Sequence, residues 1–235
     1  MAKTGPELAE KFFPGTGRSY DRVVRMATLG LDRRWKERLL GRMPRAPDRV
    51  LELASGTGIL TEMLLDRFPA ARVTCVDLTD DYQVVARGKI AARGATNVEF
   101  RLGNAETIAL GGPYDAVASS YVPKYCDPGR LASNIDRALA PGGVVLLHDF
   151  NHPRGVVPRA IWRTWFAILN LAAPRVWPEW APTFDCDLSD LIRTTTWPKD
   201  YREAFARLGY EAVGRDHLTS RAATIVHARK PAVAR

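Results

Sequence analysis

Between about residue 48 and residue 150, short apolar runs alternate with runs of helical spacing. This alternation predicts five strands, at residues 49–54, 72–77, 98–102, 115–122 and 143–150. Helical periodicity and stop signals predict helices between them, at residues 58–68, 81–93 and 128–140. Strands and helices in strict alternation form βαβ units, which give a parallel sheet with helices on both faces.

The C-terminal part of the sequence breaks the parallel pattern. A helix is expected at residues 199–208, followed by strands at 210–218 and 222–228. So short a link joins antiparallel strands, because a parallel connection needs a long crossover. The predicted fold class is therefore α/β: a Rossmann-like, doubly wound sheet, mostly parallel, with an antiparallel C-terminal hairpin.

Residues 151–198 do not alternate and are rich in tryptophan and proline. Five of the six tryptophans lie here: Trp162, Trp165, Trp177, Trp180 and Trp197. A helix is expected at residues 160–173. We interpret the segment as a helical, aromatic-rich cap over an apolar pocket. The alternative is that the rings form a second small core.

Composition and charge further narrow the classes of protein to which the chain can belong. No apolar run approaches the ~20 residues that a spanning helix needs, so we expect a soluble, cytoplasmic chain. The three cysteines are far apart and are expected to be free thiols; no metal site is expected. The net charge is +8, and residues 1–50 hold twelve Lys and Arg against six Asp and Glu. A solvated helix face explains this best, and peripheral contact with an anionic membrane is the alternative.

The strongest chemical motif follows the first strand, where residues 52–58 read Glu-Leu-Ala-Ser-Gly-Thr-Gly. A strand end, a small-residue turn and a helix start let backbone amides approach a ligand closely. Asp77 ends the second strand and can accept hydrogen bonds from both ribose hydroxyls of a nucleoside. A dinucleotide and S-adenosylmethionine both suit this arrangement. The third glycine of the dinucleotide fingerprint is replaced by Thr61, which favours S-adenosylmethionine.

Further residues carry a family resemblance. Asn104-Ala105-Glu106 follows the third strand, Tyr114-Asp115 enters the fourth, and residues 139–143 precede the fifth. In this order and spacing they resemble the class I S-adenosylmethionine-dependent methyltransferases. Tyr20-Asp21, Gly30 and the Arg33–Lys36 run resemble the N-terminal signature of the ubiquinone/menaquinone biosynthesis C-methyltransferases. Residues 218–227 are similar to the last strand of that family.

The resemblance implies a single methyltransferase domain over residues 1–235. Its parts would be a basic N-terminal helical arm (1–45), a cofactor-binding core (46–150), the Trp-rich cap (151–198) and a C-terminal helix and hairpin (199–235). The implied activity is C-methylation of an apolar aromatic (quinol-like) or isoprenoid small molecule. The residues expected to contact S-adenosylmethionine are Tyr20, Glu52, Ala54, Gly56, Thr57, Gly58, Asp77, Leu78, Asn104, Ala105 and Ser120.

One departure concerns the acceptor side. The family usually has Gly-Leu-Arg-Asn after the fourth strand, where this chain has Val122-Pro123-Lys124-Tyr125. Lys124 keeps the charge as a point donor but not the fork of an arginine. The alternatives are an O- or N-methyltransferase of a specialised metabolite and a non-catalytic S-adenosylmethionine-fold binding module. A nucleic-acid substrate is not expected, because no base-flipping motif of the Asn-Pro-Pro-Tyr type is present.

Candidate catalytic residues lie at the end of the fifth strand. His148 and Asp149 are each in place to act as a general base, although alternation sends them to opposite faces. A structural hydrogen bond is the competing role for each.

The acceptor is expected to bind between the basic arm and the cap. Four residues are assigned to it: Tyr121, Lys124, Trp162 and Trp165. Trp162, Trp165, Phe166 and Leu169 recur at helical spacing and form one apolar stripe. Arg159 and Arg163 lie among them, so this helix is also suited to rest on a membrane surface.

Overall fold

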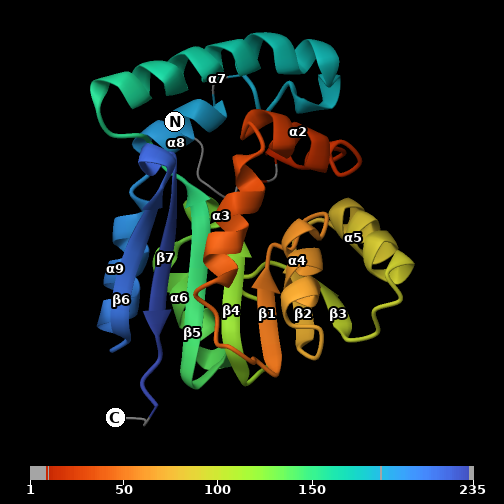
Figure 1. Cartoon of the computed structure of the whole chain (residues 1–235), viewed down its shortest axis with the longest axis vertical. Helices are drawn as coiled ribbons and strands as arrows, with labels where there is room; N and C mark the ends of the chain where they lie inside the picture. The colour runs from red at the N-terminus through yellow and green to blue at the C-terminus, as the bar shows by residue number, and fades with distance from the viewer. Residues whose placement is uncertain (1–8, 10, 186, 233–235) are drawn as a thin grey trace.

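The computed structural model describes residue 9 and residues 11–185 and 187–232. Seven strands form one sheet in the order β3-β2-β1-β4-β5-β7-β6 (Figure 1). The strands are β1 (Arg49–Leu53), β2 (Arg72–Asp77), β3 (Val98–Leu102), β4 (Tyr114–Ser120), β5 (Leu139–Phe150), β6 (Glu211–Leu218) and β7 (Ala223–Arg229). The pairs from β3 through to β5 are parallel, and β7 is antiparallel to both β5 and β6. The predicted fold class is confirmed.

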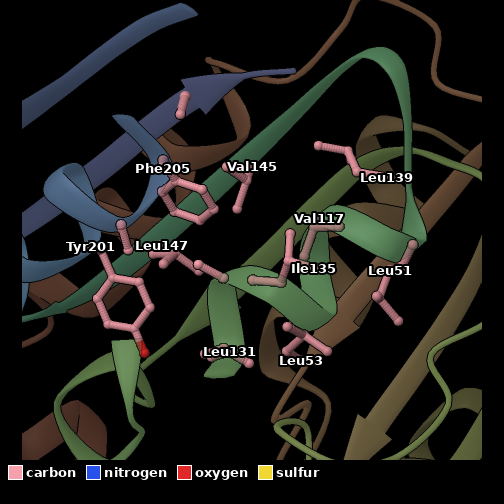
Figure 2. Close-up of a cluster of buried hydrophobic side chains, with 14 of the residues drawn as sticks. Leu51, Leu53, Val117, Leu131, Ile135, Leu139, Val145, Leu147, Tyr201 and Phe205 are labelled. Carbon is pink, nitrogen blue, oxygen red and sulfur yellow. The ribbon is translucent and has the colours of Figure 1, made fainter. Parts of the chain in front are cut away.

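Helices cover both faces of the sheet. The packing helices are α3 (Leu31–Leu40), α4 (Ile59–Arg67), α5 (Asp80–Ala92), α6 (Pro128–Ala138) and α9 (Trp197–Arg207). On one face, α6 and α9 bury Leu131, Ile135 and Phe205 against the sheet residues Leu51 and Leu147 (Figure 2). The opposite core joins α3, α4 and α5 to the other sides of the same strands. Strand side chains alternate between these two cores, as a sheet covered on both faces requires.

The fourth and fifth strands differ from their predicted bounds. β4 starts at Tyr114 and stops at Ser120, because Tyr121 adopts a left-handed conformation with φ of 71°. A short 3-10 helix, η1 (Pro123–Tyr125), follows it. β5 begins at Leu139 rather than 143, with a register shift relative to β4 at the predicted Pro-Gly-Gly turn. Sheet pairing therefore continues on both sides of that turn.

The cap and α2 of the N-terminal arm lie together beyond one end of the sheet (Figure 1). The cap helix α7 (Val156–Val176) is longer than the expected 160–173. It is followed by η2 (Pro178–Trp180) and by α8 (Asp187–Thr194), which the sequence did not predict. From the arm, α2 (Tyr20–Ala27) packs against α7 and η2 in a separate small apolar cluster. The tryptophan-rich segment therefore contributes to a small core of its own, as the alternative interpretation expected, and its role as a cap stays a prediction.

Two of the three cysteines can be described. Cys75 is buried in the core and Cys126 is partly buried, and both are free thiols. Cys186 lies outside the described residues.

Candidate active site

The predicted glycine turn follows β1 and leads into α4. Gly56 and Gly58 both have positive φ, 56° and 83°, where a side chain would be strained. A Cβ at Gly58 would also lie 3.2 Å from the Cβ of Ala86, so this glycine allows α4 and α5 to approach closely. Ala54 reaches a φ of 52° without being glycine. Backbone strain of this kind is concentrated at functional sites.

Asp77 ends β2 beside this turn, as predicted. Its carboxylate accepts hydrogen bonds from the backbone amides of Gly56, at 2.7 Å, and Thr79, at 2.9 Å. Burial raises the pKa of Asp77, and these amide hydrogen bonds act against that shift. Each carboxylate oxygen keeps a further lone pair for a ligand. The side chain is therefore fixed, and it can accept two hydroxyl donors.

A cavity of about 280 Å³ opens beside Asp77, and we call it the cofactor cavity. Eight of the predicted cofactor residues line it: Tyr20, Ala54, Gly56, Asp77, Leu78, Asn104, Ala105 and Ser120. They come from the arm and from the ends of β1, β2, β3 and β4. In open α/β sheets, this edge is where nucleotides bind.

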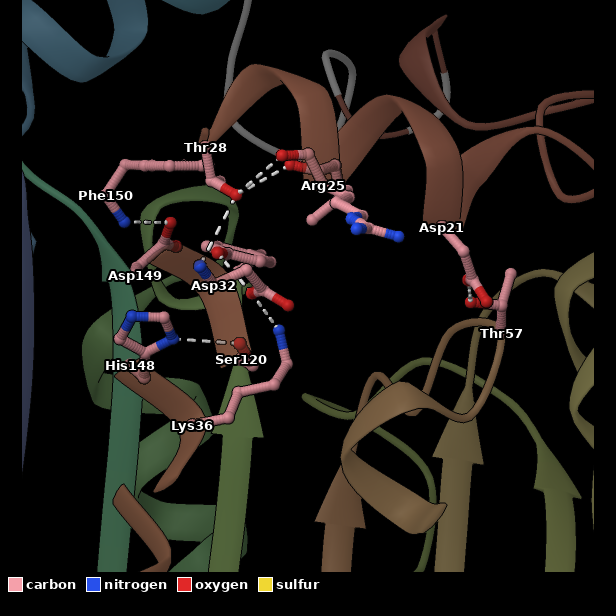
Figure 3. Close-up of polar contacts among 12 residues, drawn as sticks. Asp21, Arg25, Thr28, Asp32, Lys36, Thr57, Ser120, His148, Asp149 and Phe150 are labelled. Atoms are coloured by element: carbon pink, nitrogen blue, oxygen red, sulfur yellow. Dashed lines mark hydrogen bonds and ion pairs between the residues drawn. The ribbon is translucent and has the colours of Figure 1, made fainter. Parts of the chain in front are cut away.

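Three predicted cofactor residues do not line the cavity. Glu52 is buried on β1, where its carboxylate accepts a hydrogen bond from the Thr61 hydroxyl at 2.7 Å. The Thr57 hydroxyl donates to Asp21 of α2, which ties the turn to the arm (Figure 3). Gly58 packs against α5. These three residues therefore contact α2, α4 and α5 around the turn rather than forming the cavity wall.

Glu52 gives a pH-dependent prediction. Burial raises its pKa from 4.5 to about 7, so folding favours the protonated acid. Its contribution to stability is present below pH 4.5 and is lost as pH rises through about 7. We therefore expect Glu52→Gln, which mimics the neutral acid, to gain stability relative to wild type over that window. Urea unfolding across the window measures this, and parallel stability curves for the two proteins would contradict it.

A second cavity, of about 710 Å³, lies beneath α7, and we call it the acceptor cavity. Its walls are largely apolar and include Trp35, Phe150 and Leu169. All four residues assigned to the acceptor line it: Tyr121, Lys124, Trp162 and Trp165. It shares four aromatic side chains with the cofactor cavity: Phe13, Tyr20, Tyr121 and Tyr125. The two cavities therefore meet at an aromatic wall.

Tyr121 sits at this junction in a buried polar cluster. Its hydroxyl donates to the Asp32 carboxylate at 2.5 Å, and Asp32 forms an ion pair with Lys36 (Figure 3). The Lys36 ammonium lies 4.5 Å from the centre of the Tyr121 ring, which also stacks on Phe150 at 4.6 Å. Burial raises the pKa of Tyr121 well above 10, so the phenol stays protonated. Its oxygen remains available to accept a hydrogen bond from a hydroxyl in the acceptor cavity.

Lys124 and Asp149 form a buried ion pair. The Lys124 ammonium lies 2.6 Å from the Asp149 carboxylate, and the two side chains are 2% and 0% exposed. Asp149 also accepts from the backbone amides of Lys124 and Phe150. Lys124 lines the acceptor cavity, whereas Asp149 lies behind it and lines neither cavity. The catalytic role assigned to Asp149 stays a prediction, and the contacts shown here position Lys124.

His148 is also fully buried and lines neither cavity. Its Nδ1 lies 2.9 Å from the Ser120 hydroxyl, and its Nε2 has no partner in the described part of the chain. Burial and the nearby charges of Lys36 and Lys124 lower the pKa of His148, which keeps the ring neutral. Its catalytic role likewise stays a prediction.

Sequence reasoning missed the part played by Asp32 and by Trp35. Asp32 and Lys36 are opposite charges four residues apart on α3, a pair that a helical reading of the arm makes recognisable. The Trp35 indole donates to Thr219 and stands beside His148. No group of three or more His, Cys, Asp or Glu suited to a metal occurs among the described residues.

Comparison with known proteins shows which family the chain belongs to. Residues 50–143 match the family model described as a methyltransferase domain. Over 152 residues, 63% of this chain and 68% of the relative, it is 34% identical to the demethylmenaquinone methyltransferase of Thermus thermophilus. The chain belongs to the class I S-adenosylmethionine-dependent methyltransferases. The cofactor of this methyltransferase is S-adenosylmethionine, and both Asp77 and Asn104 line the cavity beside the glycine turn.

Two other similarities were found, one in sequence and one in fold. The methyltransferase is 31% identical to the malonyl-[acyl-carrier protein] O-methyltransferase of Haemophilus ducreyi, over 64% of this chain and 59% of that enzyme. It therefore spans about three fifths to two thirds of the length of these relatives. The geranyl diphosphate C-methyltransferase of Streptomyces coelicolor, solved with S-adenosyl-L-homocysteine, has the same fold. That structure is 15% identical, with a TM-score of 0.64 over 93% of this chain and 86% of the other.

Proposed function

We propose that this methyltransferase transfers a methyl group to a carbon of an apolar aromatic, quinol-like or isoprenoid small molecule. The observation that carries the proposal is the wall of four aromatic rings shared by the two cavities. An acceptor seated beneath α7 would therefore meet the cofactor through this wall. Holding the two partners in line, away from water, is the main contribution that the protein makes to such a transfer.

The chemistry of the acceptor cavity supports an apolar acceptor. Of the ionisable side chains on its wall, Lys124 is bound to Asp149 and Tyr121 is bound to Asp32. Most of the remaining surface is aromatic or aliphatic. A fully polar substrate would lose its hydration here without gaining partners, which is costly. A ring with one hydroxyl directed at Tyr121 suits the wall better.

Different residues of the chain would bind the cofactor and orient the acceptor. Asp77 and Asn104 would hold the ribose and adenine side of the cofactor, while Tyr20 would close over it from the arm. When bound, S-adenosylmethionine supplies a sulfonium methyl group. Tyr121, backed by Asp32, would orient the acceptor hydroxyl and accept its hydrogen bond. Electron density from that hydroxyl makes a ring carbon nucleophilic.

The names of the relatives agree with a quinol-like acceptor, and one of them also supports the alternative, methyl transfer to oxygen. The Thermus thermophilus relative is named for demethylmenaquinone, while the Haemophilus ducreyi relative is an O-methyltransferase. The altered residues Lys124 and Tyr125 lie on the acceptor cavity wall. The position of the methyl group in the product therefore decides between carbon and oxygen transfer.

Truncating Trp162 tests the acceptor cavity. Trp162 lines it and packs on Phe166 at 4.4 Å, so Trp162→Ala removes apolar contact with the acceptor. We expect KM for the acceptor to rise about tenfold or more, with S-adenosylhomocysteine affinity nearly unchanged. Trp177→Ala is the matched control, because Trp177 packs in the cap but lines neither cavity. If both variants change KM equally, the acceptor binds elsewhere.

A further inference from the structure

The outward face of α7 carries a second apolar stripe, distinct from the one predicted. Val157, Ile161, Ile168 and Leu171 are 67%, 65%, 48% and 63% exposed. Their spacing of four, seven and three residues places them on one side of the helix. The predicted stripe of Trp162, Trp165, Phe166 and Leu169 lies on the wall of the acceptor cavity. The helix therefore has apolar residues on the cavity wall and apolar residues exposed to solvent.

The outer stripe is continuous with the rim of the acceptor cavity. Ile161 and Ile168 belong to the stripe and also line the cavity. Across the rim, Leu29 in the α2–α3 connection lines the cavity and is 65% exposed. Large exposed apolar residues gathered at one place are unusual on a soluble surface and mark an interaction site.

The charged residues of α7 itself are all positive. Over its 21 residues, α7 contains three arginines, Arg159, Arg163 and Arg175, and no acidic residue. The neighbouring α2 adds Arg22 and Arg25, which are exposed. Within residues 11–185 and 187–232, none of these five arginines forms an ion pair. The surface around the cavity mouth therefore offers uncompensated positive charge.

We propose that this face, which comprises the outer stripe of α7 and the arginines of α2 and α7, docks on the surface of an anionic phospholipid bilayer. An exposed apolar stripe with flanking arginines is the pattern of a helix that lies in the membrane interface. Anionic lipid headgroups attract such arginines. None of the described helices is long and apolar enough to cross a membrane, so α7 would lie in the plane.

A second copy of the chain suits this face less well. A two-fold interface brings the same patch of two subunits together. Here that would place arginines opposite arginines, with no carboxylate on α7 to pair with them. Like charges facing each other oppose association.

Docking would place the mouth of the acceptor cavity against the lipid. This consequence rests on the proposed function: an apolar acceptor dissolved in the bilayer would enter between α7 and Leu29 without crossing water. The docking surface itself does not depend on which acceptor is methylated.

Flotation with vesicles tests the docking surface. The full chain is mixed with vesicles of phosphatidylcholine alone or with added phosphatidylglycerol, in the absence of cofactor and acceptor. We expect recovery with the anionic vesicles, little with the neutral ones, and a decrease with added salt. The variant Val157→Gln/Leu171→Gln removes two stripe residues that line neither cavity, and we expect its vesicle affinity to fall about tenfold or more.

The matched control is Val84→Gln on α5, which changes a valine of similar exposure, 60%, away from α7. We expect it to bind vesicles like wild type, while Arg159→Gln/Arg163→Gln binds more weakly. No flotation of folded wild type with anionic vesicles would overturn the proposal. Equal binding of the stripe variant and the control would overturn it too. A dimer that the stripe variant dissociates would show a second copy to be the occupant. Because the assay uses no acceptor, its failure is separate from failure of the proposed function.

Discussion

Asp149→Ala is expected to lower the free energy of unfolding by about 3–5 kcal/mol. The substitution leaves the Lys124 ammonium buried without its carboxylate, since the lysine side chain is only 2% exposed. It also removes the acceptor for the backbone amides of Lys124 and Phe150. Denaturant unfolding measures the loss, and a change below about 1 kcal/mol would contradict the ion pair.

The double variant Lys124→Met/Asp149→Leu separates a structural role from a catalytic one. Replacing both charges by apolar groups avoids the unpaired ion, so most of the stability lost in Asp149→Ala is expected to return. Asp149 lies behind the cavity wall and lines neither cavity. If the refolded double variant retains methyl transfer, Asp149 is not the general base.

Asp77→Ala is expected to weaken S-adenosylmethionine binding by roughly 3 kcal/mol, about a hundredfold, because two charge-assisted hydrogen bonds to the ribose are lost. Titration calorimetry with S-adenosylhomocysteine measures it. Asp77→Asn keeps an oxygen for the Gly56 amide, so it tests the charge with less change to the turn. Asp80→Ala is the control, being exposed at the start of α5. Unchanged affinity in both Asp77 variants would contradict the placement of the cofactor.

The sequence predicted the elements whose limits are set by local signals. β2 and β3 have the predicted bounds, 72–77 and 98–102, because the valine-rich run of β2 ends at Asp77 and the alternating run of β3 ends before Gly103. The glycine turn and Asp77 follow from the same local pattern, and eight of the residues expected to contact the cofactor line one cavity. These features depend on neighbours in sequence and on the parallel topology.

Features set by distant contacts were not predictable in this way. Tyr121 and Asp32 are 89 residues apart, and nothing local to either indicates their hydrogen bond. Alternation correctly separated His148 from Asp149, but it did not show that both lie behind the cavity walls. The outer face of α7 was missed because the aromatic stripe of the same helix dominated the pattern.

One assay tests the central claim, that an apolar acceptor beneath α7 meets the cofactor through the aromatic wall. The purified chain is incubated with S-adenosylmethionine and either a reduced prenylated quinol or the same quinol without its prenyl tail. Mass spectrometry then measures the gain of one methylene unit. We predict methylation of the prenylated quinol at a ring carbon, with a lower KM than for the tailless one, and loss of that difference in Trp162→Ala. Preferential methylation of a small, fully polar acceptor, with the Trp162 variant as active as wild type, would contradict the account.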